Sequence, residues 1–195
     1  MKASVNIMPT GLIIPAPEQK VWLISDTHFD HTNIIRFCNR PYNSTREMNE
    51  DMIRAWNRFV KDEDLVIILG DVACGYRARP AEHFLRQLKG EKVLVLGNHD
   101  VGFVQGADAV LRHGAILRYL KQDFLLVHQP NTINKELFPK VKWLIHGHVH
   151  NTDLANYSLV NHKNKTINVS CEVTGYMPIE LAKLFEGVKK AKLYK

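Results

Sequence analysis

Residues 21–31 read Val-Trp-Leu-Ile-Ser-Asp-Thr-His-Phe-Asp-His, an apolar run that ends in side chains able to bind a metal. Short continuous apolar runs closed by turn residues are typical of strands buried on both faces. Four further runs end in the same way, and they lead into Asp71, Asn98-His99-Asp100, His128 and His148-Val-His150. Ligands of such sheets bind at the carboxyl ends of the strands. The sequence therefore predicts an α/β fold that gathers two Asp, one Asn and several His at one rim.

The order of elements along the chain is strand, helix, strand, helix, strand, and then mostly strands. Ser44-Thr-Arg-Glu47 fits a capping box, and Met48, Met52 and Trp56 give the following helix an apolar face. A loop at 130–140 is expected to pass over the strand ends, where loops often carry function. Helices are expected over 32–39, 44–60, 80–89 and 182–192, and hairpins over 116–127 and 157–169.

The chain of 195 residues is expected to form a single domain spanning 1–195. Its three cysteines, Cys38, Cys74 and Cys171, form no CxxC pair and are odd in number, so we expect free thiols in a reducing compartment. No run approaches the ~20 apolar residues of a membrane span. These features predict a cytoplasmic protein without a membrane segment. Cys74 lies three residues past Asp71, and a packing role for it is favoured over a role at the site.

The net charge is +6, and lysines crowd the C-terminus from Lys183 to Lys195. Basic residues attract phosphate-bearing partners, although a solvated helix end is the simpler interpretation of these lysines. The chain has neither a GxxxxGK loop nor a GxGxxG motif, so nucleoside triphosphate and dinucleotide cofactors are not indicated.

The residue types at the predicted rim favour a particular class of metal. Oxygen donors together with imidazoles are typical of sites for a divalent ion such as Mn, Fe, Zn or Ni, and are less typical of a zinc site built from thiolates. Asp26 and His28 are two residues apart, and side chains at that spacing on an extended strand point the same way. His148 and His150 repeat the spacing. Each pair is therefore expected to hold a metal from one strand end.

Five blocks stand in order along the chain: Asp26-x-His28, Gly70-Asp71, Gly97-Asn98-His99-Asp100, His128 and Gly147-His148-x-His150. This set resembles the calcineurin-like metallophosphoesterases over roughly residues 21–170. The segments Asp26–His31 and Asn39-Arg-Pro41 look most like a small bacterial and phage-type branch of that superfamily. The resemblance implies two packed mixed β-sheets flanked by helices, a four-layer αββα sandwich.

The resemblance also implies a dinuclear centre of two divalent ions, Mn²⁺ foremost, with Fe, Zn, Ni or Mg as alternatives. A hydroxide that bridges the two ions would attack phosphorus. His99 would stay off the metals as the general acid, oriented by Asp100. The first metal would be held by Asp26, His28 and His150, the second by Asn98, His128 and His148, and Asp71 would bridge them with its two carboxylate oxygens.

Three further residues are candidate substrate contacts. His31 follows His28 closely, and a loop position without a role is equally favoured for it. Arg36 and Arg40 could grip a phosphate with two hydrogen bonds, or could lie on a solvated helix face.

The leading function is hydrolysis of phosphate esters, with phosphodiesters of the nucleotide type preferred because the short chain has no obvious cap domain to enclose a monoester. A phosphomonoesterase, including a protein phosphatase, is the nearest alternative. A nuclease that binds nucleic acid and a metal-binding scaffold without activity are the others. The expected partner is a phosphate ester, with nucleotide or nucleic acid favoured.

Overall fold

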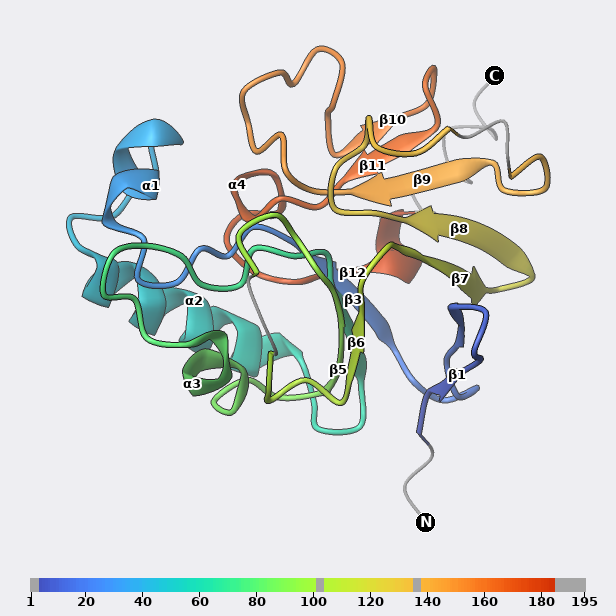
Figure 1. Ribbon diagram of the computed structural model, residues 1–195, viewed down its shortest axis with the longest axis horizontal. Helices are drawn as coiled ribbons and strands as arrows, with labels where there is room; N and C mark the ends of the chain where they lie inside the picture. The colour runs from blue at the N-terminus through green and yellow to red at the C-terminus, as the bar shows by residue number, and fades with distance from the viewer. Residues whose placement is uncertain (1–3, 101–103, 135–137, 185–195) are drawn as a thin grey trace.

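The structure is a computed structural model that describes residues 4–100, 104–134 and 138–184. Its strands form two mixed sheets (Figure 1). A seven-stranded sheet has the order β1-β2-β7-β8-β9-β11-β10, and a five-stranded sheet has the order β12-β3-β4-β5-β6. The strands are β1 (Asn6–Ile7), β2 (Leu12–Ile14), β3 (Val21–Ile24), β4 (Leu65–Ile68), β5 (Glu91–Val95), β6 (Ala109–Leu111), β7 (Ala115–Tyr119), β8 (Gln122–Leu126), β9 (Trp143–His146), β10 (Val160–Asn161), β11 (Thr166–Asn168) and β12 (Ile179–Glu180).

The strands β3, β4 and β5 are buried on both faces, as their continuous apolar runs predict. In β4, Leu65 and Ile67 face the seven-stranded sheet, where they pack with residues such as Leu117 and Phe124. Successive side chains of a strand point to opposite faces. The intervening Val66 of β4 accordingly packs on the helix side of the sheet.

The helices α1 (Thr32–Phe37), α2 (Thr45–Phe59) and α3 (Ala81–Leu85) lie on the outer face of the five-stranded sheet (Figure 1). The predicted cap of α2 is confirmed, since the Ser44 hydroxyl accepts a hydrogen bond from the backbone N–H of Glu47 at 3.2 Å. Its apolar face is buried through Met48, Met52 and Trp56. The third helix is shorter than predicted, and turns replace its expected last residues.

The seven-stranded sheet is covered on its outer face by the loop that follows β8. Ile133, Phe138 and Val141 of this loop pack against the buried Leu125 and Leu144. The described part of this loop thus covers the buried side chains of β8 and β9 on that face. The predicted fold class, two packed mixed sheets with flanking helices, is confirmed.

The predicted hairpin of β7 and β8 is confirmed, with Tyr119 paired to Gln122 across a two-residue turn. The second predicted hairpin is shorter than expected and consists of β10 and β11. The expected C-terminal helix begins at residue 181, and its part beyond residue 184 lies outside the described residues. A short helix, α4 (Cys171–Thr174), follows β11. Among the described residues, no helix combines the length and the apolar character needed to cross a bilayer.

Candidate metal centre

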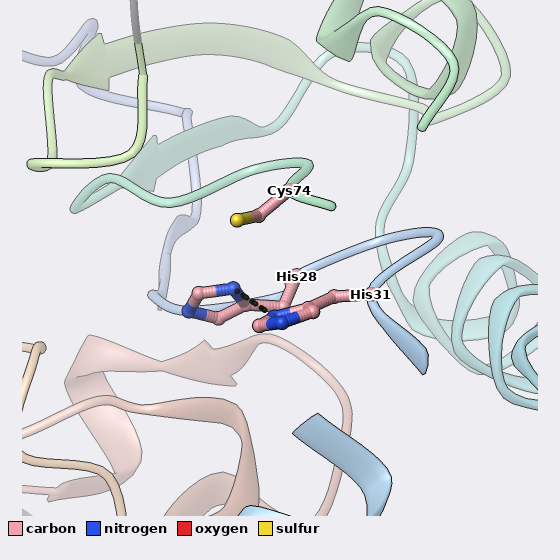
Figure 2. Close-up of side chains that lie close together, drawn as sticks. All are labelled: His28, His31 and Cys74. Carbon is pink, nitrogen blue, oxygen red and sulfur yellow. Dashed lines mark hydrogen bonds between the residues drawn. The ribbon is translucent and has the colours of Figure 1, made fainter. Parts of the chain in front are cut away.

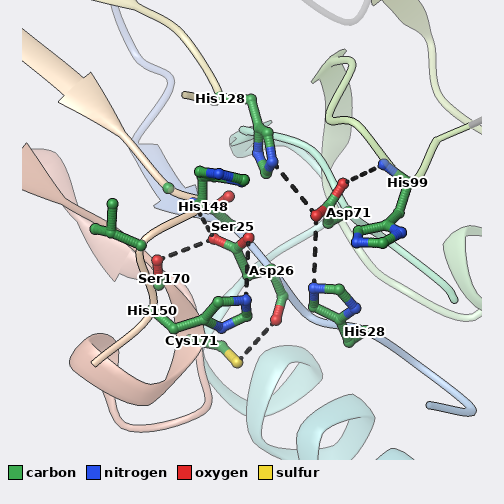
Figure 3. A network of polar contacts seen from close by, with 12 residues as sticks. Ser25, Asp26, His28, Asp71, His99, His128, His148, His150, Ser170 and Cys171 are labelled. Atoms are coloured by element: carbon green, nitrogen blue, oxygen red, sulfur yellow. Dashed lines mark hydrogen bonds and ion pairs between the residues drawn. The ribbon is translucent and has the colours of Figure 1, made fainter. Parts of the chain in front are cut away.

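The side chains expected to bind metal converge at the carboxyl ends of five strands. Asp26 and His28 follow β3, and Asp71 follows β4, which is parallel to β3. His128 and the pair His148 and His150 follow β8 and β9, which are parallel neighbours in the other sheet. Asn98 follows β5. The two packed sheets therefore contribute ligand-type side chains to one shared rim (Figure 3).

The backbone conformation of Asp26 and His28 differs from the extended strand that their spacing predicted. Both residues lie beyond the end of β3 in the left-handed region, with φ of 57° and 48°. His148 and His150 do the same after β9, with φ of 69° and 48°. The expectation of an extended strand at these pairs was wrong. Such conformations cost about 1–3 kcal/mol each for a non-glycine residue, and they cluster at functional sites.

Asp71 lies at the middle of the cluster. Its Oδ2 atom is 3.5 Å from His28 Nε2 and 3.3 Å from His128 Nε2. Its Oδ1 atom accepts a hydrogen bond from the backbone N–H of His99 at 2.9 Å. A single oxygen of Asp71 thus faces both imidazoles, whereas the resemblance implied a bridge formed by both carboxylate oxygens (Figure 3).

Two of the clustered atoms have charged neighbours but accept or donate no hydrogen bond in the described part of the chain, as is expected where a ligand binds. Asp26 Oδ1 and His28 Nε2 are buried and have no hydrogen-bond partner among the described residues. Burial raises the pKa of Asp26. Burial also lowers the pKa of His28 to about 3, so its imidazole is neutral near pH 7. A neutral imidazole is the form that binds metals, and a cation would satisfy both orphaned atoms.

Two groups of side chains place their ligand atoms within 4.8 Å of one another: Asp26, His28 and His150, and Asp71, His128 and His148. Asn98 joins the second group, because its Oδ1 lies 2.9 Å from His128 Nε2. The oxygen and nitrogen donors fit divalent ions of the first transition row. The residues present therefore fit the dinuclear centre that the family resemblance implies.

Glycines allow the ligand loops to approach this closely. A Cβ atom on Gly97 would lie 2.2 Å from Asp71 Oδ1, and one on Gly147 would lie 1.9 Å from Ser25 Oγ and 2.4 Å from Asp26 Oδ2. Each distance is shorter than any van der Waals contact. The glycines that precede Asn98 and His148 are therefore required by space.

Asp100 has a different position from the expected one. Its carboxylate accepts hydrogen bonds from the backbone N–H groups of Asp71 at 2.7 Å, Val72 at 3.0 Å and Gly97 at 2.9 Å. The contacts of the described residues include none between the Asp100 carboxylate and the His99 imidazole. Asp100 therefore ties the loop after β4 to the loop after β5.

The expected substrate contacts have three different surroundings. Arg40 is buried, and its guanidinium donates to the carbonyls of Asp26 and Thr27, both at 2.8 Å, and to Glu172 at 2.7 Å. An internal ion pair of this kind leaves no free fork for a phosphate, so the expected role of Arg40 conflicts with the structure. Arg36 is exposed on α1. His31 is half-buried, with its Nδ1 3.2 Å from that of His28.

The structure places several residues at the site that the sequence analysis did not predict. Glu172 accepts from His150 Nδ1 at 3.1 Å, and Ser170 donates to Asp26 Oδ2 at 2.9 Å. Both follow β11, which pairs with β9 in parallel. Its sequence Thr166-Ile-Asn168 is not a continuous apolar run, so it lacked the signal of the other five strands. Gln129 Nε2 lies 3.3 Å from Asn98 Oδ1 and 3.4 Å from His148 Nε2. Its position directly after His128 was its only signal.

Residues 19–152 match the model of the calcineurin-like phosphoesterases. The match covers more than half of the chain, and the chain belongs to this family. It is 38% identical over 179 residues to the uncharacterized protein MJ1445 of Methanocaldococcus jannaschii, covering 90% of this chain and 94% of that protein.

Two further comparisons support the assignment of fold and branch. The solved structure of the protein of unknown function AQ665 from Aquifex aeolicus superposes with a TM-score of 0.69 at 23% identity, covering 87% of this chain and 99% of that one. The gene 66 protein of Mycobacterium phage L5 is 31% identical over 90 residues, or 45% of this chain and 43% of that protein. The phage relative agrees with the expected phage-type branch.

Proposed function

We propose that this protein hydrolyses phosphodiesters of the nucleotide type at a dinuclear metal centre. One observation carries the proposal: Asp26, His28 and Asp71 converge with other predicted ligands beside the exposed His99. Within this cluster, Asp26 Oδ1 and His28 Nε2 are buried without a hydrogen-bond partner among the described residues. The first metal would be held by Asp26, His28 and His150, the second by Asn98, His128 and His148, and Asp71 Oδ2 would lie between them. Mn²⁺ is our first choice, with Fe, Zn, Ni or Mg as the alternatives.

Two divalent ions, when bound, supply positive charge that orients the phosphoryl group and lowers the pKa of an attacking water. The protein's own groups do the rest. The backbone N–H of His99 donates to Asp71 Oδ1, which fixes the position of His99 relative to the centre. Its imidazolium would donate a proton to the oxygen of the departing alcohol, a contribution of about 10²–10⁴ in rate.

The preference for diesters is supported by two cavities that share Asn98. One has a volume of about 460 Å³ and is lined by His99 and Cys74, and the other has a volume of about 400 Å³ and is lined by His128 and Arg112. A phosphodiester carries two substituents, and the two cavities would offer each of them a separate place. A monoester would leave one cavity unused.

The test compares bis-p-nitrophenyl phosphate with p-nitrophenyl phosphate on chelator-stripped protein to which Mn²⁺ is returned stepwise. We expect metal-restored hydrolysis of the diester that exceeds hydrolysis of the monoester. Arg112→Ala should lower the diester rate without changing the metal content. The matched variant Arg58→Ala should leave the diester rate unchanged, because Arg58 lines neither cavity. A monoester rate far above the diester rate would overturn the proposed preference.

A further inference from the structure

A second cluster of ligand-type side chains lies at the edge of the centre. The Cys74 sulfur is 3.4 Å from His99 Nδ1. Ligand atoms of Cys74, His31 and His28 lie within 4.8 Å of one another. Figure 2 shows the thiol of Cys74 facing the rings of His28 and His31. The ligands expected for the two catalytic metals do not include Cys74, His31 or His99.

The donors of this cluster differ in kind from those of the dinuclear centre. A thiolate with two imidazoles suits a soft or borderline cation such as Zn²⁺ or Cd²⁺, whereas Mn²⁺ and Mg²⁺ favour oxygen donors. In a tetrahedral zinc site with ordinary Zn–S and Zn–N bonds, the sulfur and nitrogen are roughly 3.5 Å apart. The separation of Cys74 and His99 is close to this value. A ligand atom of His31 lies within 4.8 Å of the Cys74 sulfur, so its ring would have to move closer when a cation binds.

We propose that Cys74, His31 and His99 form a third metal site, which takes up Zn²⁺ or Cd²⁺ and inhibits the enzyme. His28 stays outside the site, because its Nε2 faces Asp71 while its Nδ1 faces His31. Binding would exchange the Cys74 thiol proton for the cation. It would also occupy Nδ1 of His99, so the ring could no longer carry the extra proton that makes it an acid. The inhibition rests on the proposed role of His99, but the metal site itself does not.

The cluster is open to solvent ions. His99 is exposed, and His31 and Cys74 are half-buried. The other thiols differ, because Cys38 and Cys171 are buried. Cys38 does lie near His150 and Glu172, which makes it the thiol that must be separated from Cys74 by experiment.

The experiment titrates the Mn²⁺-loaded full-length protein with Cd²⁺. The ultraviolet absorbance of thiolate-to-cadmium charge transfer reports binding, and elemental analysis reports retained Mn²⁺. We expect one Cd²⁺ per chain with Mn²⁺ retained. Cys74→Ser should abolish the absorbance, His31→Gln should shift the titration to higher Cd²⁺, and Cys38→Ser should leave it unchanged. A band that survives in Cys74→Ser, or Cd²⁺ that binds only by displacing Mn²⁺, would overturn the site.

A second readout separates the site from its consequence. Zn²⁺ inhibition of diester hydrolysis should be relieved in Cys74→Ser, relative to the uninhibited rate of that variant. Cd²⁺ binding at Cys74 without slower hydrolysis would keep the site and overturn its inhibitory role. Absence of hydrolysis in the unmodified protein would count against the proposed function, while the absorbance titration would still decide the metal site.

Discussion

The carboxylate of Glu172 lies 3.1 Å from Nδ1 of His150, and the other ring nitrogen of His150 points at Asp26 Oδ1, 3.8 Å away. Arg40 holds Glu172 from behind through a buried ion pair of 2.7 Å. Burial alone would lower the pKa of His150, but contacts with Cys38 and Glu172 outweigh it and raise that pKa to about 10. Glu172 therefore fixes the ring with Nε2 turned toward the centre, as partners of metal-binding histidines commonly do. A bound metal would take the place of the proton on Nε2.

Replacing Glu172 by Gln should weaken metal binding by about 10–100-fold, because the partner that orients His150 loses its charge. Calorimetric titration of the metal-free protein with Mn²⁺ measures the effect. Glu63→Gln is the matched control, since the Glu63 side chain is 60% exposed. Equal Mn²⁺ affinity in the two variants would show that Glu172 has no part in metal binding.

Gly147→Ala should damage both stability and the centre. The added methyl group would overlap Ser25 Oγ and Asp26 Oδ2, and relieving that overlap moves the end of β9 away from β3. We expect a loss of about 1–3 kcal/mol in the free energy of unfolding, together with reduced Mn²⁺ stoichiometry. Gly175→Ala is the control, because no atom lies within 4 Å of its Cβ position and only its φ of 77° opposes the change. Full Mn²⁺ binding by Gly147→Ala would contradict the close approach of the two loops.

The ion pair between Asp30 and Arg79 predicts a dependence of stability on pH. Hydrogen bonds from Arg79 at 2.7 and 2.8 Å lower the pKa of Asp30 to about 2 from 3.8. The contribution of Asp30 to the free energy of unfolding is therefore complete above pH 3.8, and it is lost as the pH falls through about 2. Because Arg79 is half-exposed, solvent weakens the ion pair, and we expect it to contribute about 1–2 kcal/mol to the free energy of unfolding at pH 7.

Urea unfolding of the metal-free protein at pH 7 and at acid pH measures this contribution. Asp30→Asn should be less stable than the unmodified protein at pH 7, and the difference should shrink as the pH approaches 2. Glu50→Gln, at a side chain that is 66% exposed, should show no such trend. A difference that is independent of pH would mean that charge on Asp30 does not contribute.

Substitutions in the turn between β7 and β8 are expected to raise the stability of the protein. Leu120 and Lys121 both have positive φ, 50° and 61°, the conformation of a type I′ turn, which favours Asn-Gly. Leu120 is also 73% exposed. The double variant Leu120→Asn/Lys121→Gly should therefore raise the free energy of unfolding by about 1–2 kcal/mol, without altering Mn²⁺ binding. Thermal unfolding followed by circular dichroism would check it, and an unchanged or lower midpoint would contradict the turn assignment.

The sequence predicted the strands that carry the site, because β3, β4 and β5 are buried on both faces and their apolar runs are continuous. It did not predict β1, β2, β6 and β12, each only two or three residues long. Pairing with a neighbour defines such short strands, and pairing leaves no local periodicity. The helix expected over 80–89 is also shorter than predicted, since α3 ends at Leu85 and turns follow it.

The site was predictable as a set of residue types but not as a geometry. The left-handed conformations of Asp26 and His28 are imposed by surrounding contacts, such as the backbone hydrogen bond from His28 to the Asp71 carbonyl at 3.0 Å. The burial of Arg40 depends on Glu172, which is 132 residues away in the chain. Long-range pairs of this kind leave no spacing signal. The expectation of a cytoplasmic protein stays a prediction, as do the assignments of Arg36 and His31 to substrate.

The central claim separates residues that hold metal from the residue that supplies a proton. The most direct measurement determines bound Mn²⁺ and the rate of bis-p-nitrophenyl phosphate hydrolysis together, in His99→Ala and in Asp71→Asn. We predict that His99→Ala retains two Mn²⁺ per chain and loses about 10²–10⁴ in rate, while Asp71→Asn loses both metal and activity. An empty centre in His99→Ala, or full activity in Asp71→Asn, would contradict the account.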